Sequence, residues 1–175
     1  MKNPPHSYFT IFAAIVKTLN RVFETTAVIC LIGISALIFA QIVLRNFFSI
    51  GLPWLDEMAR FLHIALVFLM VPVLLSEDGH IRIDFLSTRL KPRWQGWLQI
   101  LILTACALFA GAFLASDIEF MSSYWDVPSP AMNMPNIIFF GSAFVGMAGL
   151  LLNAFGKLVH YILTSFKNGA ATWAE

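Results

Sequence analysis

Four apolar segments dominate the chain, and they constrain its fold more strongly than any other feature. Residues 25–44 and 94–116 carry no charged side chain, and neither do residues 61–76 and 127–156. A helix needs about 20 mostly apolar residues to cross the hydrocarbon core of a bilayer. Only 12% of all residues are charged, against about 25% in a typical soluble domain. The sequence therefore predicts an all-α integral membrane protein with four transmembrane helices.

Local signals indicate where these helices begin and end. The segment at 61–76 reaches spanning length only if its helix begins near Trp54, which brings three charged residues into its first turns. Prolines between residues 128 and 135 indicate that the last helix begins near Asn136. The first segment is too long for the apolar region of a signal peptide, so we expect a retained anchor. We expect one membrane domain over residues 1–175, with spans at about 25–45, 54–76, 94–116 and 136–157.

The distribution of basic residues predicts the orientation. The N-terminal part, the loop at 77–93 and the C-terminal tail together carry nine Lys and Arg residues, whereas the other two loops carry two. Short loops rich in Lys and Arg remain in the cytoplasm. We therefore expect both termini inside the cell, and the 41–60 turn and the acidic third loop outside.

Two further segments have an amphipathic pattern. In residues 8–24, polar side chains share one helical face opposite apolar ones. This segment either lies at the inner surface or extends the first span inward. The loop at 77–93 also combines apolar with basic residues, so we expect an interfacial helix whose basic side chains face lipid phosphates. The alternative for this loop is a short solvated connector.

Small and polar residues form a seam along the last span. They recur at spacings of four and three residues, which places them on one helical face: Ser142, Gly146, Gly149, Asn153 and Gly156. Small residues allow another helix to approach closely. The resulting packing contacts stabilise helix association within lipid, where the hydrophobic effect does not drive it. The seam packs either against this chain's own helices or against a second membrane protein. The third span has a shorter version at Ala107, Gly111 and Ala115.

The sequence lacks the motifs of several enzyme classes. It has no P-loop, no dinucleotide-binding glycine motif, no nucleophile elbow and no zinc-ligand spacing. Only His63 lies well inside a span, which disfavours a di-haem site, and we expect it to make a helix–helix hydrogen bond. A net charge of +1 implies no nucleic-acid partner. We predict no enzymatic activity, cofactor or metal.

Ionisable residues are expected at mid-membrane in a protein that carries ions itself. The deep parts of these spans have none, which favours a subunit that supports a transport path formed elsewhere. A membrane-bound electron carrier and a stand-alone assembly factor remain alternatives.

Charged residues at the turn between the first two spans need a structural reason, because charge is costly near a bilayer. Gln41 and Arg45 share a face at the end of the first span. Glu57 and Arg60 are three residues apart on the next helix, where they can pair. The connector at 46–53 is short enough for Arg45 to meet Glu57. We expect these charges either to lock the hairpin or to contact a partner protein.

Two motifs in this chain resemble those of a known family. Residues Gln41, Arg45, Phe48, Pro53, Trp54, Glu57 and Arg60 resemble a Q-x-x-x-R…F…P-W-x-x-E-x-x-R block, and residues 79–84, which include His80, Arg82 and Asp84, read G-H-I-R-I-D. Both are similar to motifs in the small membrane subunit of tripartite ATP-independent periplasmic (TRAP) transporters. The resemblance covers roughly residues 20–165. Asn46 departs from the pattern, because an aromatic residue often follows the arginine.

The resemblance implies a function and a set of partners. In this family the small subunit scaffolds a large multi-span subunit that carries substrate and sodium, and a periplasmic protein delivers an organic acid such as a sialic acid or a C4-dicarboxylate. It implies a multi-pass protein of the bacterial inner membrane that binds no ATP. On this resemblance the motif residues of both blocks are structural or partner-contact residues: Gln41, Arg45, Trp54, Glu57, Arg60, His80, Arg82 and Asp84.

Overall fold

Four long α-helices make up the described part of the fold. The computed structural model describes residues 6–77, 92–125, 127–135 and 137–171. Within these residues the helices are α1 (His6–Phe48), α2 (Pro53–Ser76), α4 (Pro92–Ser123) and α5 (Ile137–Ala171). All four are long and apolar enough to cross a membrane, and the described residues contain no β-strand. The predicted all-α membrane fold with four spanning helices is therefore confirmed, and its orientation stays a prediction.

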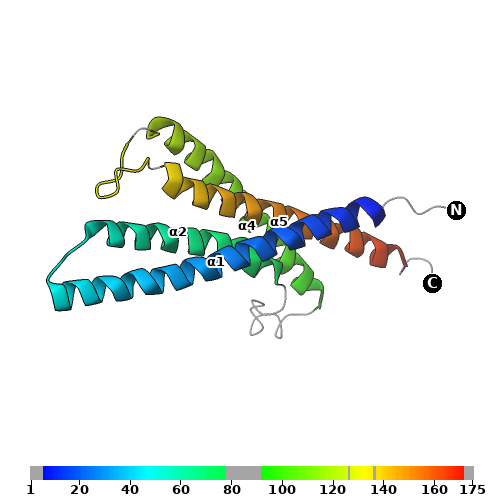
Figure 1. Ribbon diagram of the computed structural model, residues 1–175. Coiled ribbons are helices and arrows are strands. Elements are labelled where there is room, and N and C mark those ends of the chain that lie inside the picture. Colours follow the sequence, from blue (N-terminus) through cyan, green and yellow to red (C-terminus); the bar gives the residue numbers. More distant parts are fainter. Residues whose placement is uncertain (1–5, 78–91, 126, 136, 172–175) are drawn as a thin grey trace.

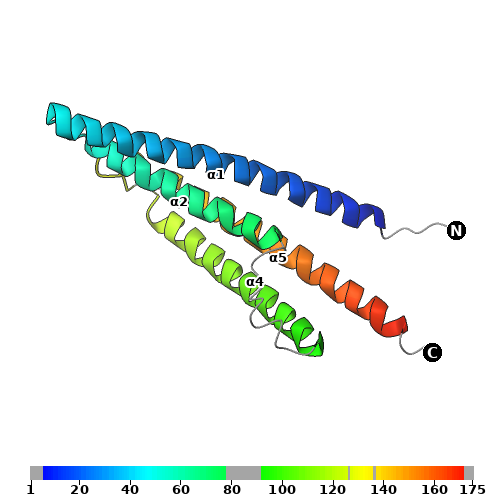
Figure 2. The same ribbon diagram turned by 90° about the horizontal axis from the view of Figure 1, so that it is seen from below.

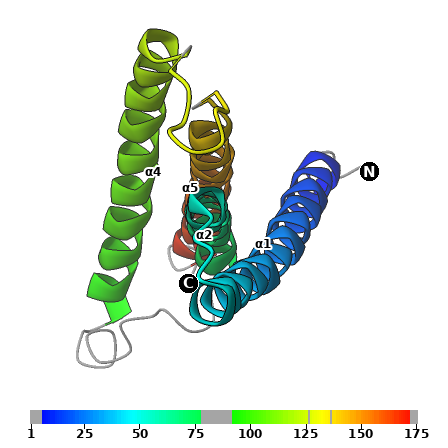
Figure 3. The same cartoon turned by 60° about the vertical axis from the view of Figure 1, so that its left-hand side comes forward.

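The helices form a row and do not close into a bundle. α1 packs along α2, α2 along α5, and α5 along α4. Figures 2 and 3 show α1 and α4 on opposite sides, with α2 and α5 between them. The helices of the row run roughly along one direction, and the start of α1 and the end of α5 lie at the same end of it (Figure 1). We call this the terminal end, and we call the opposite end, with residues 44–60, 124, 125 and 127–135, the hairpin end.

Helix α1 is one continuous helix of 43 residues. At 1.5 Å per residue it is about 64 Å long, roughly twice the thickness of the hydrocarbon core. The amphipathic residues near the N-terminus therefore extend the first span. Its buried residues follow one stripe with spacings of three and four, as expected for a helix with one packed face: Asn20, Phe23, Ala27 and Cys30.

Helix α2 begins where its sequence indicates. Pro53 occupies its first turn, where a missing backbone N–H costs nothing. Before it, the chain reverses through Ser49, which has a positive φ of 54°, and the amide of Ile50 donates to the carbonyl of Leu44 at 3.1 Å. The turn is therefore compact enough to hold α1 and α2 antiparallel. Further along α2, Pro72 lies inside the helix and is fully buried.

Helix α4 is longer than predicted. The third span is expected to end near residue 116, but α4 continues to Ser123 and contains Asp117 and Glu119. The difference arises because charged residues are compatible with helix continuation, so the first charge does not mark the helix end. Asp117 is buried, seven residues after the buried Ala110 and on the same face. The expected interfacial helix in the 77–93 loop lies largely outside the described residues.

Candidate functional sites at the two ends of the helix row

A buried carboxylate joins α2 to the loop between α4 and α5. The Oε2 atom of Glu57 accepts hydrogen bonds from the backbone N–H groups of Ala131 at 2.8 Å and Met132 at 2.9 Å. The side chain of Ser129 also hydrogen-bonds this carboxylate. Glu57 is only 7% exposed although it is charged. A carboxylate that accepts several such bonds is a strong link between two segments.

The loop is shaped so that two successive amides face one oxygen atom. The amide of Ser129 donates to the carbonyl of Met134 at 2.8 Å, and the amide of Asn133 donates to the carbonyl of Ser129 at 3.1 Å. Asn133 has a φ of 52°, a left-handed conformation that Asn tolerates better than most residues. An isolated bridge pairs Pro128 with Pro135 at the base of this turn. The tight turn thus presents the amides of residues 131 and 132 to α2.

The predicted meeting of Arg45 with Glu57 does not occur. Arg45 is exposed at the end of α1, and among the described residues it forms no ion pair. The backbone amides of the loop satisfy Glu57 instead. Arg60 lies one turn further along α2 and interacts electrostatically with Glu57, as its spacing indicates. Gln41 is half-buried, and Trp54 is exposed.

The prediction that His63 makes a helix–helix hydrogen bond is wrong for the described part of the chain. Its side chain is exposed, and the structure shows no hydrogen bond from it to another described residue. It therefore lies on a face of α2 that does not meet the neighbouring helices.

The glycine seam of α5 packs inside this chain. A Cβ atom at Gly146 would collide with the backbone carbonyl group of Phe68 in α2. At Gly149 it would lie 2.6 Å from the ring of Phe23 in α1, and at Gly156 it would lie 2.7 Å from the ring of Phe12. Of the two alternatives for these glycines, the structure shows contact with the chain's own helices.

The shorter seam of the third span behaves differently. A Cβ atom at Gly111 would have no neighbour within 4 Å. Ala107 is half-buried and Ala115 is exposed. This face of α4 therefore has room for larger side chains in the described structure.

Two amides link α1 to α5 across the row. The side-chain amide of Asn20 donates to Asn153 at 3.0 Å, and Asn153 donates back to Asn20 at 3.1 Å. Asn153 also donates to the carbonyl of Gly149 at 2.9 Å. Both side chains are buried. The sequence pattern puts Asn153 in the seam and Asn20 on a polar face, but it does not indicate that they pair.

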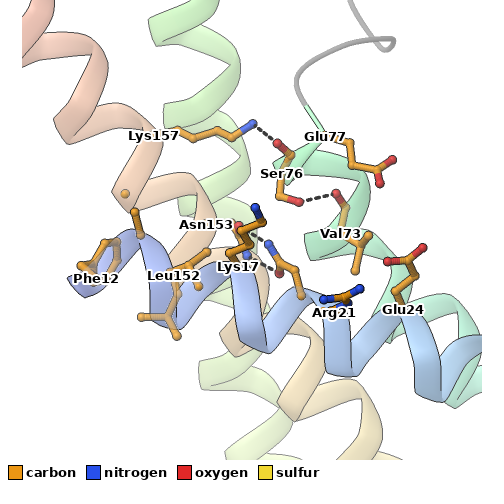
Figure 4. Close-up of a pocket in the computed structure, with 14 residues that line it drawn as sticks. Phe12, Lys17, Arg21, Glu24, Val73, Ser76, Glu77, Leu152, Asn153 and Lys157 are labelled. Atoms are coloured by element: carbon orange, nitrogen blue, oxygen red, sulfur yellow. Dashed lines mark hydrogen bonds between the residues drawn. The ribbon is translucent and has the colours of Figure 1, made fainter. Parts of the chain in front are cut away.

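An open cleft of about 690 Å³ lies at the terminal end, between α1, α2 and α5. Figure 4 shows Lys17 and Arg21 on α1 and Lys157 on α5 around this cleft. Asn20 and Asn153 also line it. The ammonium group of Lys157 donates to the carbonyls of Leu75 and Ser76, the latter at 3.0 Å. It thereby caps the C-terminus of α2, where carbonyl groups lack helical partners.

The remaining candidate residues either lie outside the described structure or belong to no metal-binding cluster within it. The residues of the second motif, His80, Arg82 and Asp84, lie outside the described residues. The described part of the chain has no cluster of three or more His, Cys, Asp or Glu side chains that could hold a metal. Asp117 is 6% exposed, and its Oδ2 atom has no hydrogen-bond partner in the described structure. Its burial is a cost that the described contacts do not offset.

The helix row and its polar links define a polytopic α-helical membrane protein in which the buried side chains of Asn20, Glu57 and Asn153 join its own elements. Residues 34–164 match the family described as "Tripartite ATP-independent periplasmic transporters, DctQ component". The chain belongs to this family, which confirms the resemblance seen in the sequence and places the protein in the bacterial inner membrane as a multi-pass protein.

Individual relatives agree with this assignment. Two TRAP transporter small permease proteins of Haemophilus influenzae are 22% identical over 135 residues and 28% identical over 141 residues. These matches cover 77% and 78% of this chain, and 81% and 83% of the relatives. The isethionate TRAP transporter permease protein DctMQ of Oleidesulfovibrio alaskensis is 31% identical over 87 residues, which are 49% of this chain and 14% of that protein.

Proposed function

We propose that this chain is the scaffolding subunit of a sodium-coupled TRAP transporter for an organic acid, such as a sialic acid or a C4-dicarboxylate. The observation that carries the proposal is the family match over residues 34–164. On this proposal the chain binds a large multi-span subunit that carries substrate and sodium. It performs no chemical conversion and holds no cofactor.

A similarity to a longer protein supports the large partner. The chain matches 14% of the length of a permease protein named DctMQ, so most of that protein has no counterpart here. A separate large subunit would supply the missing part. The name of that relative refers to isethionate, an organic anion, which agrees with an organic acid as the class of substrate.

The internal links of the chain support a bracing role. Glu57 ties α2 to the loop before α5, and the asparagine pair ties α1 to α5. The glycine contacts bring α5 close to both α1 and α2. A subunit whose helices are joined at both ends resists shape change, which suits a fixed support beside a moving partner.

The exposed residues of the first motif are candidates for partner contact. Arg45, Trp54 and Arg60 are exposed at the hairpin end. With both termini in the cytoplasm, this end faces the periplasm, where a substrate-binding protein would reach it. Gln41 lies one turn before Arg45 and is half-buried. The second motif, with His80, Arg82 and Asp84, would then face the cytoplasm.

Co-purification tests the proposal most directly. The full-length chain, tagged and expressed in its native host, is extracted in mild detergent, and bound proteins are identified by mass spectrometry. We expect a large multi-span TRAP subunit in roughly equal amount. Uptake of candidate organic acids by the reconstituted complex, with and without a sodium gradient, then tests coupling and substrate class. If no large membrane partner accompanies the chain, the scaffolding role is wrong.

A further inference from the structure

Asp117 on α4 is a buried carboxylate that the links described above do not use. Its side chain is 6% exposed, and its Oδ2 atom accepts no hydrogen bond from any described residue. It lies inside the candidate membrane span Trp97–Ser123, about 9 Å along the helix from Ser123. Ionisable side chains inside a membrane are costly, and they pair with another charged or polar group. Asp117 therefore needs a partner that the described part of the chain does not provide.

The basic residues of the hairpin end do not supply that partner. In the described part of the chain they are Arg45 and Arg60. Arg45 is in the last turn of α1, on the opposite side of the row from α4 (Figure 3), and Arg60 on α2 interacts with Glu57. With the last two turns of α4, this end carries two more acidic than basic side chains, the acidic ones being Asp56, Glu57, Asp117 and Glu119. The excess of negative charge favours a basic partner.

An apolar pocket of about 290 Å³ lies between α2, α4 and α5. Its lining side chains are Ile64 and Phe68 on α2, Phe113 on α4, and Phe139, Phe140 and Ala143 on α5. All of them except Ala143 are only half-buried, so the pocket opens to the surface of the chain. The described helices thus leave an aromatic-lined space within the membrane-spanning region.

Asp117 lies between two residues that contact this pocket. Phe113, one turn before Asp117, lines the pocket, and Phe120, one turn after it, packs against Phe140 with 4.7 Å between the ring centroids. At 100° per residue, the side chains of Phe113, Asp117 and Phe120 lie within about 60° of one another around α4. The carboxylate of Asp117 is therefore at the edge of the pocket, on the side nearer the hairpin end.

We propose that a basic side chain, Lys or Arg, of the large subunit enters this pocket and pairs with Asp117. Its aliphatic stem lies among the phenylalanine rings, and its charged end reaches the carboxylate. Aromatic faces attract cations, so a pocket lined by phenylalanine suits a basic side chain. α4 is an edge helix of the row, so a partner can approach it from outside the row (Figures 2 and 3). The inference rests on the proposed function, because it names one contact by which the large subunit binds.

Asp117→Asn distinguishes this role from an internal structural one. In the isolated chain the carboxylate lacks a described partner, so removal of its charge should leave the melting temperature in detergent unchanged or raised. In the complex the same substitution removes one member of a buried charge pair, so it should weaken association by at least about 30-fold. Titration of the purified large subunit into the full-length chain in mild detergent measures the association.

Two further variants of this chain test the charge and the pocket separately. Glu119→Gln removes the same charge from an exposed position two residues further along α4, and it should leave association unchanged. Ala143→Leu keeps Asp117 but places a larger side chain in the pocket, and it should weaken association. Circular dichroism checks that each variant is folded.

A double-mutant cycle identifies the basic residue of the partner. Each Lys and Arg in the spans of the large subunit is replaced by Gln, alone and together with Asp117→Asn. For the paired residue, the double variant should lose much less affinity than the product of the two single losses, because each single variant leaves one charge unpaired.

The outcomes separate this inference from the proposed function. If the large subunit binds Asp117→Asn as tightly as the wild type, the inference is overturned and the scaffolding role stands. If it does not bind the wild-type chain at all, both are overturned. A loss of stability of the isolated chain in Asp117→Asn as large as that of the complex would show an internal role. Absence of coupling to any basic residue would exclude a charge pair. A phospholipid retained by the wild-type complex and lost from Ala143→Leu would show that an acyl chain occupies the pocket instead.

Discussion

Glu57 shows how a single side chain can organise one end of a membrane protein. Its carboxylate is separated by more than 70 residues in sequence from the amides that it accepts. The sequence indicates that Glu57 needs a partner, because a charge at this position is costly. It cannot indicate which partner, because backbone amides are present at every residue except proline and carry no sequence signature. In the sequence, Arg45 is the most evident candidate partner for Glu57. In the structure, the partners are the loop amides of residues 131 and 132.

Replacing Glu57 tests the link between α2 and the loop. Glu57→Ala removes the acceptor of two backbone amides and should lower the thermal stability of the chain in detergent and of its complex. Glu57→Gln keeps one acceptor oxygen, so its melting temperature should lie between those of the wild type and Glu57→Ala. A thermal-shift assay with the purified protein measures both.

Glu119→Ala is the matched control for Glu57. Glu119 is exposed on α4, and its side chain makes no hydrogen bond or ion pair in the described structure. Glu119→Ala should therefore change the melting temperature much less than Glu57→Ala does. Equal shifts for Glu57→Ala and Glu119→Ala would contradict the assigned link.

The asparagine pair permits a quantitative test of the contact between α1 and α5. Interhelical hydrogen bonds within membranes contribute about 0.6 kcal/mol on average and about 1.7 kcal/mol at most. Asn20 and Asn153 exchange two such bonds, so a double-mutant cycle of Asn20→Ala and Asn153→Ala should give a coupling energy of about 1 kcal/mol. Reversible unfolding in mixed micelles measures this energy. A coupling energy of zero would show that the two amides act independently.

The periodicity of α5 is readable from the sequence, whereas the partner of its seam is not. Spacings of three and four residues are sufficient to place the small residues on one face of the helix. Lipid and protein surfaces are similarly apolar, so a small residue does not reveal which helix approaches it. The structure identifies Phe68 on α2, and Phe12 and Phe23 on α1, as the neighbours. The length of α4 has a different cause: its apolar run ends at residue 116, but Asp117 and Glu119 are compatible with a helix that continues to Ser123.

Glycine substitutions distinguish the two seams. Gly146→Leu would force a side chain into the backbone of α2, and overpacking of this kind costs about 1–3 kcal/mol or more. Gly111→Leu meets open space on α4 and should leave the stability of the isolated chain unchanged or slightly raised. Thermal unfolding of the two variants in the same detergent provides the comparison. A similar loss of stability in both variants would contradict the packing of α5 against α2.

The order of the helices in the row depends on long-range contacts that the sequence does not encode locally. Four spans and short connections predict that neighbours in sequence pack together, which holds for α1 with α2 and for α4 with α5. The contact of α2 with α5 is different, because α4 lies between them in sequence. It depends on the glycines of α5 and on the capping of α2 by Lys157.

The orientation of the whole molecule remains a prediction from its basic residues. In a chain with Cys30 and Cys106 replaced by alanine, Ser49→Cys at the hairpin end should react with a membrane-impermeant maleimide in intact spheroplasts. Ala14→Cys at the terminal end should react only after permeabilisation. Both positions are exposed, so a difference in labelling reports the side of the membrane. The reverse pattern would place both termini outside.

The continuity of α1 has a consequence for its permitted length. Asn20 faces α5, and Gly33 faces Leu62 of α2, where an added Cβ would lie 3.0 Å away. Both contacts are on one uninterrupted helix, so their angular relation is fixed by the number of residues between them. One inserted residue would rotate one contact by about 100° relative to the other and move it about 1.5 Å along the axis. An insertion of seven residues would nearly restore the angle after two turns but would move the contact by about 10.5 Å along the axis, so the length of α1 between Asn20 and Gly33 can change only together with the lengths of α2 and α5.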